Sequence, residues 1–324
     1  MDNLELIRMS DIEAEEVKWL WYPYIPMGKI TILQGDPGEG KTTFILSVIA
    51  SLTKGEALPE SIAQDAVNVI YQTAEDGLSD TIKPKLLSLG ADCERVMVID
   101  ESKKELTFLD ERIEKSIKNV NAKLIVLDPM QAYLGGSVDM HRANEVRPYM
   151  KHLSQIAEKT GCAVVLVGHM NKAQGIKSGY RGLGSIDFAA AARSVLVVGK
   201  LKSNPALRIM AQDKSSLAPN GASIAFELSK DNGFQWKGSC EFTVDDVLTG
   251  TGKVQTKVML MEGELKNYIA PTRKAEEVIL HAAKMGVSER TLMTAKKNLG
   301  IVSEKKEGIW YWTLEKEGCN IASS

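Results

Sequence analysis

The stretch GDPGEGKT, residues 35–42, restricts the possible folds of this chain more than any other feature, because it matches the pattern G-x-x-x-x-G-K-[ST] at every position. An apolar, β-prone run at residues 29–34 precedes it. After it, apolar residues recur at helical spacing, namely Phe44, Ile45, Val48, Ile49 and Leu52. Glycines allow backbone N–H groups to close around phosphate oxygens, and the beginning of a helix adds a favourable field. A strand, a Gly-rich loop and a helix in this order predict a phosphate-binding loop in an α/β fold.

The residue types inside this loop indicate a nucleoside triphosphate with Mg²⁺. We expect Lys41 to reach the β- and γ-phosphates and the Thr42 hydroxyl to hold the metal ion. A Gly-rich turn could match by chance, but the correct flanks on both sides disfavour that alternative. The expected nucleotide-binding residues are Gly35, Asp36, Pro37, Gly38, Glu39, Gly40, Lys41, Thr42 and Thr43.

Composition places the chain among ordinary globular proteins, since 44% of its 324 residues are hydrophobic and 25% are charged. That size allows one large domain and a small one. The acidic N-terminus lacks the apolar segment of a signal peptide, and no apolar run reaches the roughly 18 residues of a membrane span. The four cysteines are scattered, which favours reduced thiols and disfavours a zinc site. We therefore expect a cytoplasmic protein without a membrane partner.

The pattern of strands and helices predicts four parts. Residues 1–28 form an aromatic lead-in, and 29–244 form an α/β core with a mainly parallel sheet, because Val/Ile-rich runs alternate with helical ones. Within that core the expected strands are 29–34, 67–73, 95–99, 123–127, 163–168 and 194–199, followed by short strands at 207–210, 223–228 and 234–237. Residues 245–268 are poorly patterned and are expected to be a linker, and 269–324 form a last compact unit.

Three polar positions follow predicted strands whose carboxyl ends meet the phosphate-binding loop. Asp128 ends the run LIVLDP and is expected to orient Mg²⁺ or its water. Glu75, in TAED, is the expected base for the attacking water, with Asp76 as the competing choice. Both acids could instead cap the helix that follows. His169 ends VVLVGH and is expected to sense the γ-phosphate, although a histidine at a strand end is often structural.

The segment after His169 is rich in glycine and basic residues and contains no acid between residues 173 and 184. Lys172, Lys177 and Arg181, with an aromatic residue among them, suit contact with a single-stranded nucleic-acid backbone. A mobile surface loop is the competing interpretation. Arg181 could also pack near the nucleotide.

The ordered motifs GDPGEGKT, TAED, LIVLDP, VGHMNK, RGLGSIDFAAAARS and QDKSSLAPNG together resemble RecA-like ATPases. Among these, the chain is similar to RepA-type plasmid helicases and related mobile-element ATPases, over roughly residues 17–240. The resemblance implies a ring, a hexamer, with ATP and Mg²⁺ between subunits. It also implies Lys41, Glu75, His169 and Lys214 as catalytic residues and Thr42 and Asp128 as metal ligands.

The resemblance departs from the family pattern at one position. Replicative helicase relatives present a Lys-x-Arg pair to the neighbouring subunit, and Lys214 matches the lysine, but Ser216 occupies the arginine position. Because such a charge is worth roughly 10³–10⁵ in rate, its replacement matters. Three alternatives remain: Lys214 acts alone, Arg193 or Arg181 substitutes, or hydrolysis is slow.

The last unit has the pattern of a winged helix-turn-helix. A helix is expected at 272–286, a second at 289–299 with Ser288 as N-cap, and the alternating run 308–314 is expected to be a wing strand. This resembles the DNA-binding tail of many mobile-element ATPases. Residues 253–324 carry 12 Lys and Arg against 9 Asp and Glu. We expect duplex DNA to contact Arg290, Lys296 and Lys297, although a role in protein contact or ring assembly is the alternative.

These inferences together favour an ATP-hydrolysing ring helicase in plasmid or mobile-element replication, with single-stranded DNA passing through the ring. The alternative is a non-motor ATP switch or DNA-binding regulator. A nucleotide kinase is disfavoured because no arginine-rich lid segment is apparent. A GTPase is disfavoured because Asn171-Lys172-Ala173-Gln174 lacks the aspartate that would pair with guanine.

Overall fold

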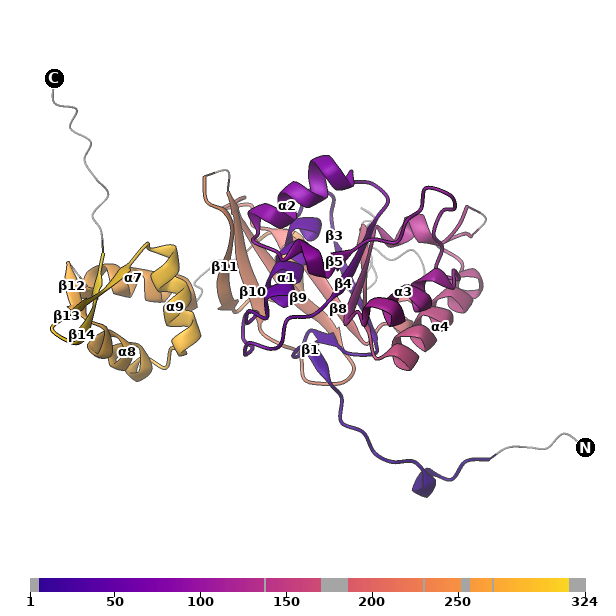
Figure 1. Ribbon diagram of the computed structural model, residues 1–324, viewed down its shortest axis with the longest axis horizontal. Coiled ribbons are helices and arrows are strands. Elements are labelled where there is room, and N and C mark those ends of the chain that lie inside the picture. The colour runs from indigo at the N-terminus through magenta and orange to yellow at the C-terminus, as the bar shows by residue number, and fades with distance from the viewer. Residues whose placement is uncertain are drawn as a thin grey trace, which may run out of the picture.

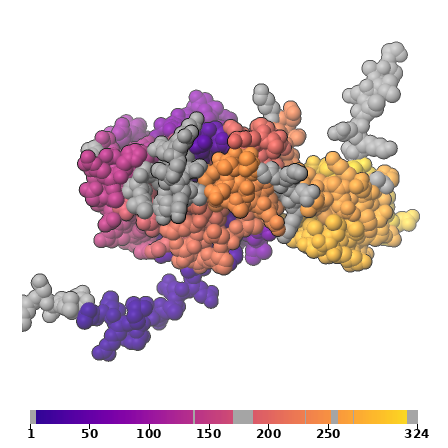
Figure 2. Space-filling view, turned by 180° about the vertical axis from the view of Figure 1, so that it is seen from behind, coloured from indigo at the N-terminus to yellow at the C-terminus, as the bar shows by residue number. Residues whose placement is uncertain are grey.

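The computed structural model describes residues 6–136, 138–169, 186–229, 231–251, 257–269 and 271–314. A large α/β body and a smaller C-terminal unit lie side by side, and the N-terminal segment extends away from the body (Figure 1). The space-filling view from the opposite side shows the C-terminal unit, in orange and yellow, as a separate lobe beside the body (Figure 2). Among the described residues, none of the helices has both the length and the apolar character to cross a membrane.

A nine-stranded mixed sheet forms the centre of the body. Six neighbouring strands, from β8 to β5, are parallel, and β9, β10 and β11 extend the sheet in antiparallel fashion. The predicted α/β fold with a mainly parallel sheet is therefore confirmed, and the short strands predicted after residue 207 extend that sheet. In spatial order the strands are β11 (Gly233–Cys240), β10 (Ser223–Ser229), β9 (Leu207–Ser215), β8 (Ser194–Lys200), β3 (Ile30–Gly35), β7 (Ala163–His169), β6 (Leu124–Asp128), β4 (Val69–Thr73) and β5 (Val96–Met97).

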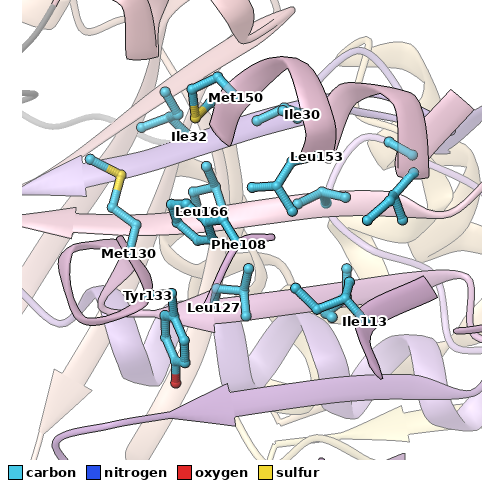
Figure 3. Close-up of a cluster of buried hydrophobic side chains, with 14 of the residues drawn as sticks. Ile30, Ile32, Phe108, Ile113, Leu127, Met130, Tyr133, Met150, Leu153 and Leu166 are labelled. Carbon is cyan, nitrogen blue, oxygen red and sulfur yellow. The ribbon is translucent and has the colours of Figure 1, made fainter. Parts of the chain in front are cut away.

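Helices cover both faces of this sheet because alternate strand residues point to opposite sides. Leu33, on one face, packs with α1 (Lys41–Lys54) and α2 (Lys83–Ser88). Its neighbour Ile32 packs on the other face with α3 (Arg112–Val120), α4 (Ala143–Thr160) and α5 (Ile186–Ala191). Figure 3 shows that second layer, in which Met150 and Leu153 lie over Ile32 and Leu166. Short 3-10 or π segments are η1 (Met9–Asp11), η2 (Leu78–Ile82), η3 (Cys93–Arg95) and η4 (Met130–Tyr133).

The aromatic part of the lead-in, residues 19–26, covers one end of the core. Strands β1 (Trp19–Trp21) and β2 (Ile25–Pro26) pair with each other. The buried Trp21 ring lies 6.1 Å from that of Phe44, and its indole N–H donates to the Pro59 carbonyl at 2.9 Å. This aromatic part of the lead-in is thus structural.

Two helices lie within the range expected to be a linker. Helix α6 (Val244–Thr249) begins at a capping box in which Thr243 and Asp246 exchange hydrogen bonds. Helix α7 (Lys257–Ile269) buries one apolar face in the C-terminal unit. Its pattern was weak because a glycine interrupts it and apolar side chains also lie on its exposed side, and the burial that stabilises it comes from tertiary packing.

The C-terminal unit combines three helices with a small sheet among the described residues. Its elements are α7, β12 (Thr272–Lys274), α8 (Ala275–Lys284), α9 (Glu289–Asn298), β13 (Val302–Lys306) and β14 (Ile309–Thr313). The sheet order is β12-β14-β13, entirely antiparallel. Helix α8 begins three residues later than expected because Thr272–Lys274 pair with β14. Ser288 caps α9 as predicted, since its side chain accepts a hydrogen bond from the Thr291 N–H.

Candidate functional site

The loop between β3 and α1 is shaped by three glycines that a side chain would disturb. Gly38 and Gly40 adopt φ values of 79° and 89°, which favour glycine. At Gly35 a Cβ atom would lie 2.2 Å from the Val198 carbonyl oxygen, so only glycine fits beside β8. The crest of the loop, Asp36 to Gly38, is exposed. The backbone therefore forms an open cradle at the carboxyl edge of the sheet.

Lys41 lies at the base of this cradle with its amine held in place. The Nζ atom donates to the Gly35 carbonyl at 2.8 Å and to the Asp36 carbonyl at 3.0 Å, and lies 3.2 Å from Nδ1 of His169. Burial lowers the pKa of Lys41, and the nearby Asp128 carboxylate opposes that shift. A buried, oriented ammonium group is suited to binding phosphate oxygens.

Asp128 and Thr42 face each other from β6 and α1. The Thr42 hydroxyl donates to the Asp128 carboxylate at 3.0 Å, and the Tyr71 hydroxyl donates to the same oxygen at 2.9 Å. Burial raises the pKa of Asp128, while these two hydrogen bonds hold it down. A hydroxyl and a carboxylate oxygen in this position fit Mg²⁺, which prefers hard oxygen ligands. When bound, Mg²⁺ would neutralise charge on the phosphates.

Tyr71 was not identified from the sequence. It lies within β4, and its ring is fully buried. The only available signal was one phenol inside a predicted strand. Its partner is apparent only from the pairing of β4 with β6, which places Tyr71 opposite Val126. Its hydroxyl fixes the orientation of the Asp128 carboxylate.

Of the two candidate bases, Glu75 faces the site and Asp76 turns away. A Glu75 carboxylate oxygen lies 3.5 Å from Nε2 of His169. The Asp76 carboxylate lies 3.4 Å from the Lys85 amine, and the backbone N–H of Asp76 donates to the Thr73 hydroxyl. The half-exposed His169 thus lies between Lys41 on one ring nitrogen and Glu75 on the other.

The outer side of the cradle is bordered by two basic residues. The Lys200 amine lies 3.4 Å from the Glu39 carboxylate. Arg208, which the sequence did not single out, would lie 3.0 Å from a Cβ atom on Gly40. Its Nε is buried without a hydrogen-bond partner among the described residues, and burial lowers the pKa of Arg208. No local motif marks Arg208, because the pairing of β8 with β9 brings it to the loop.

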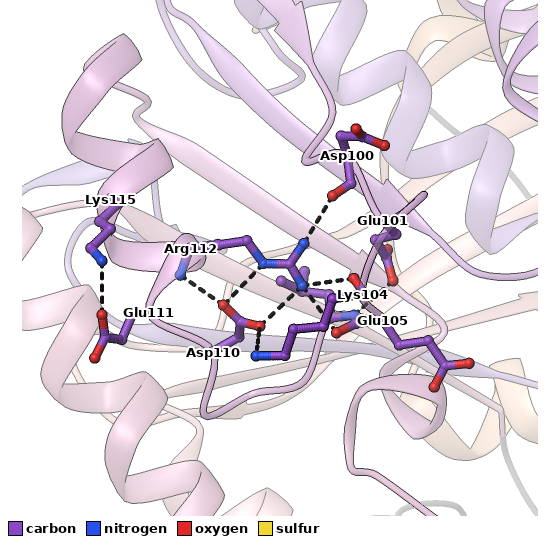
Figure 4. A network of polar contacts seen from close by, with 9 residues as sticks. Asp100, Glu101, Lys104, Glu105, Asp110, Glu111, Arg112 and Lys115 are labelled. Atoms are coloured by element: carbon purple, nitrogen blue, oxygen red, sulfur yellow. Dashed lines mark hydrogen bonds and ion pairs between the residues drawn. The ribbon is translucent and has the colours of Figure 1, made fainter.

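A polar network fixes the loop after β5, which Gln72 joins to β4 (Figure 4). Gln72 extends the pairing of β4 by bonding both backbone groups of Ile99, at 3.1 and 3.0 Å. Arg112 donates to the Asp110 carboxylate at 3.1 and 3.0 Å and to the Asp100 carbonyl at 2.8 Å. The Arg112 guanidinium holds the pKa of Asp110 well below its usual range. This network supports the edge of the site and contributes no reacting group.

Lys214 lies at the opposite, amino edge of the parallel strands, because β9 runs antiparallel to β8 and Lys214 pairs with Val195. Its amine donates to the carbonyls of Ala189 and Ala192 at 2.7 and 2.8 Å. Burial lowers the pKa of Lys214, and Arg193 beside it lowers the pKa further. Arg193 itself is exposed. Neither cation is placed to reach the loop of its own chain.

The expected DNA-contacting residues lie in two places. Lys172, Lys177 and Arg181 lie outside the described residues. In α9, the Lys296 amine lies 4.3 Å from the centre of the Trp312 ring, and Lys297 is exposed. Arg290 instead faces the large body, as described below.

A P-loop nucleotide-binding α/β protein is the class that this sheet and this cradle define. The chain belongs to the AAA domain family, which matches residues 3–175, just over half of its length. This family assignment supports ATPase activity with ATP and Mg²⁺.

Curated relatives are DNA repair proteins named RadA. The protein from Halalkalibacterium halodurans is 27% identical over 147 residues, which is 45% of this chain and 28% of that protein. The one from Streptococcus pneumoniae is 25% identical, over 51% of this chain and 36% of that protein. The chain thus spans about a third of the length of these relatives. Among solved structures, a KaiC-like protein from Pyrococcus horikoshii aligns with a TM-score of 0.49 and 19% identity, covering 65% of this chain and 90% of that one.

Proposed function

We propose that this protein hydrolyses ATP to move on or remodel DNA, as a RecA-like ring helicase in plasmid or mobile-element replication. The observation that carries the proposal is the convergence of Lys41, Thr42, Asp128, Glu75 and His169 at one edge of the sheet. The RadA relatives, named as DNA repair proteins, support a role on DNA and a cytoplasmic location.

In this mechanism the P-loop N–H groups and Lys41 bind the phosphates, and Thr42 and Asp128 would hold Mg²⁺. Glu75 accepts a proton from the attacking water as that water forms its bond to the γ-phosphorus and the bond to the leaving ADP oxygen breaks. His169, which lies between Lys41 and Glu75, reports the state of the γ-phosphate to the segment that follows it. That segment carries Lys172, Lys177 and Arg181, which bind single-stranded DNA.

The ring, a hexamer, is proposed because the catalytic cations are split between two edges. Lys214 or Arg193 of one subunit would complete the site of its neighbour, since the P-loop of its own chain lies at the other edge. We further propose that residues 269–324 form a winged helix-turn-helix that binds duplex DNA. The helix order, the Ser288 cap and the β12-β14-β13 order support that assignment.

A non-motor ATP switch is the second candidate, and one observation favours it. Lys214 is engaged with the carbonyls at the end of α5 in its own chain, and so is not presented to a neighbour. In that case nucleotide binding would control assembly, with slow hydrolysis.

One pair of assays separates the two candidates. The ATPase rate is measured with and without single-stranded DNA, and strand displacement is measured on a forked duplex. A motor requires both DNA-stimulated turnover and displacement. An ATPase rate that is the same with and without DNA, together with no strand displacement, contradicts the motor and favours the switch.

A further inference from the structure

A cavity of about 480 Å³ lies between the large body and the C-terminal unit and is lined by residues of both. On the body side it is bordered by α1, by the turn after it and by β11, which contribute Ser51, Glu60 and Trp236 among others. On the other side its wall is α9, including Arg290 and Lys297. The helix expected to read DNA therefore faces protein.

Arg290 bridges the two parts directly. Its two terminal nitrogens donate to the backbone carbonyls of Ala57 and Ser61, in the turn that follows α1. Burial lowers the pKa of Arg290, and the Glu60 carboxylate in the same turn opposes that shift. Two carbonyls at fixed spacing match the planar fork of a guanidinium, which makes this contact specific to arginine.

The same side of α9 carries two of the three expected DNA contacts, Arg290 and Lys297, whereas Lys296 lies over the Trp312 ring. Arg290, Thr294 and Lys297 are spaced by four and three residues, so they share one face of the helix, and all three border the cavity. The body presents Glu56 and Glu60 to this basic face. Helix α7 adds a contact at the same junction, since a Cβ atom on Gly238 of β11 would lie 2.7 Å from the Val258 side chain.

We propose that the body is an intramolecular partner of this α9 face, and that docking there excludes duplex DNA from it. The inference rests on the proposed DNA-binding role of the C-terminal unit. A recognition helix must enter a major groove about 12 Å wide, which a helix seated against protein cannot do. The apparent affinity for duplex DNA is then reduced by the fraction of molecules that are undocked.

Glu60→Lys in the full chain tests the proposal from the body side, because it repels Arg290 without altering α9. Glu105→Lys is the matched control: it makes the same charge change at an exposed position in the loop after β5, at the other end of the sheet. Two quantities are measured. Modification of Arg290 by phenylglyoxal, followed by mass spectrometry, reports docking, and fluorescence anisotropy with a short duplex reports DNA binding.

We expect Arg290 to react faster in Glu60→Lys than in the control, and duplex affinity to rise about threefold or more above that of the control. Equal Arg290 reactivity in the two variants overturns docking. Faster reaction with equal duplex affinity overturns the exclusion. Absence of duplex binding in every variant overturns the proposed DNA role of the tail, while the Arg290 reactivity still decides whether docking occurs.

Discussion

The two edges of the central sheet differ in whether their proposed catalytic residues already face a nucleotide site. At the carboxyl edge, Thr42 donates a hydrogen bond to Asp128, and Lys41 is held by two carbonyls of the loop and lies beside His169. At the amino edge, the Lys214 amine is held by carbonyls of its own chain, and Arg193 is exposed.

This difference indicates what one chain can do alone. The carboxyl edge is organised to bind a nucleotide before any partner arrives, whereas the amino edge needs a change of partner to take part in catalysis. Under the proposed ring, we expect a single chain to bind ATP and assembly to raise its turnover.

The largest expected effect tests the amino edge. Lys214→Met should lower turnover about 10³-fold while leaving nucleotide binding intact, because a cation supplied in trans stabilises charge in the transition state. Steady-state kinetics and binding of a fluorescent nucleotide are the measurements. Lys29→Met, on the same edge, is the control, since it removes only an exposed ion pair with Glu158.

A mixing experiment sharpens this test. Lys41→Met and Lys214→Met proteins, each inactive alone, should recover part of the turnover when combined, because some interfaces then pair an intact loop with an intact Lys214. No recovery, with both variants folded, would count against a shared site. If Lys214→Met keeps full turnover, Arg193→Ala becomes the variant to measure.

At the carboxyl edge, Glu75→Gln should lower turnover by about 10²–10³ without weakening ATP binding, since it removes the proposed general base. Asp76→Asn is the natural comparison because Asp76 contacts Lys85 instead of the site. We expect that second variant to stay within about threefold of the parent. The reverse order of effects would transfer the role to Asp76.

A smaller effect is expected from Tyr71→Phe, which removes the hydroxyl that orients Asp128. The concentration of free Mg²⁺ needed for half-maximal turnover should rise about tenfold, as is usual when a group supporting a metal ligand is lost. Tyr133→Phe is the control, because the Tyr133 hydroxyl is buried without a hydrogen-bond partner among the described residues. Equal Mg²⁺ dependence in the two variants would contradict the orienting role.

The smallest effect on turnover is expected from Asp110→Asn, in the supporting network. The folded-state pKa of Asp110 is depressed, so its contribution to stability is present above the unfolded pKa of about 4 and is lost as the pH falls through the folded value. We expect the free energy of unfolding at pH 7 to fall by about 1–3 kcal/mol, measured in urea, with turnover nearly unchanged. A large loss of turnover would place the network within the catalytic machinery.

Much of the site at the carboxyl edge was predictable because each of its residues lies next to a strand that its own segment of sequence indicates. Each polar group follows a buried strand, and parallel strands bring their carboxyl ends together, so the positions of Asp128 and His169 relative to the loop follow from the order of elements alone. The fold class followed from the same alternation.

Features that depend on distant pairing were not predictable. Tyr71 matters because β4 and β6 align in register, and Arg208 reaches the loop because β9 folds back on β8. Helix α7 depends on burial in the C-terminal unit, and the position of Arg290 depends on how two parts of the chain pack together. Neither the pairing of distant strands nor the packing of two parts of the chain produces a hydrophobic periodicity within a single segment.

The close approach at Gly35 changes how loop mutants should be interpreted. A methyl group there would collide with the Val198 carbonyl whether or not a nucleotide is bound. Gly35→Ala would therefore misfold the junction of β3 and β8, and its inactivity would be mistaken for a failure to bind phosphate. Lys41 offers a cleaner way to inactivate the site, since replacing its side chain introduces no collision with the backbone.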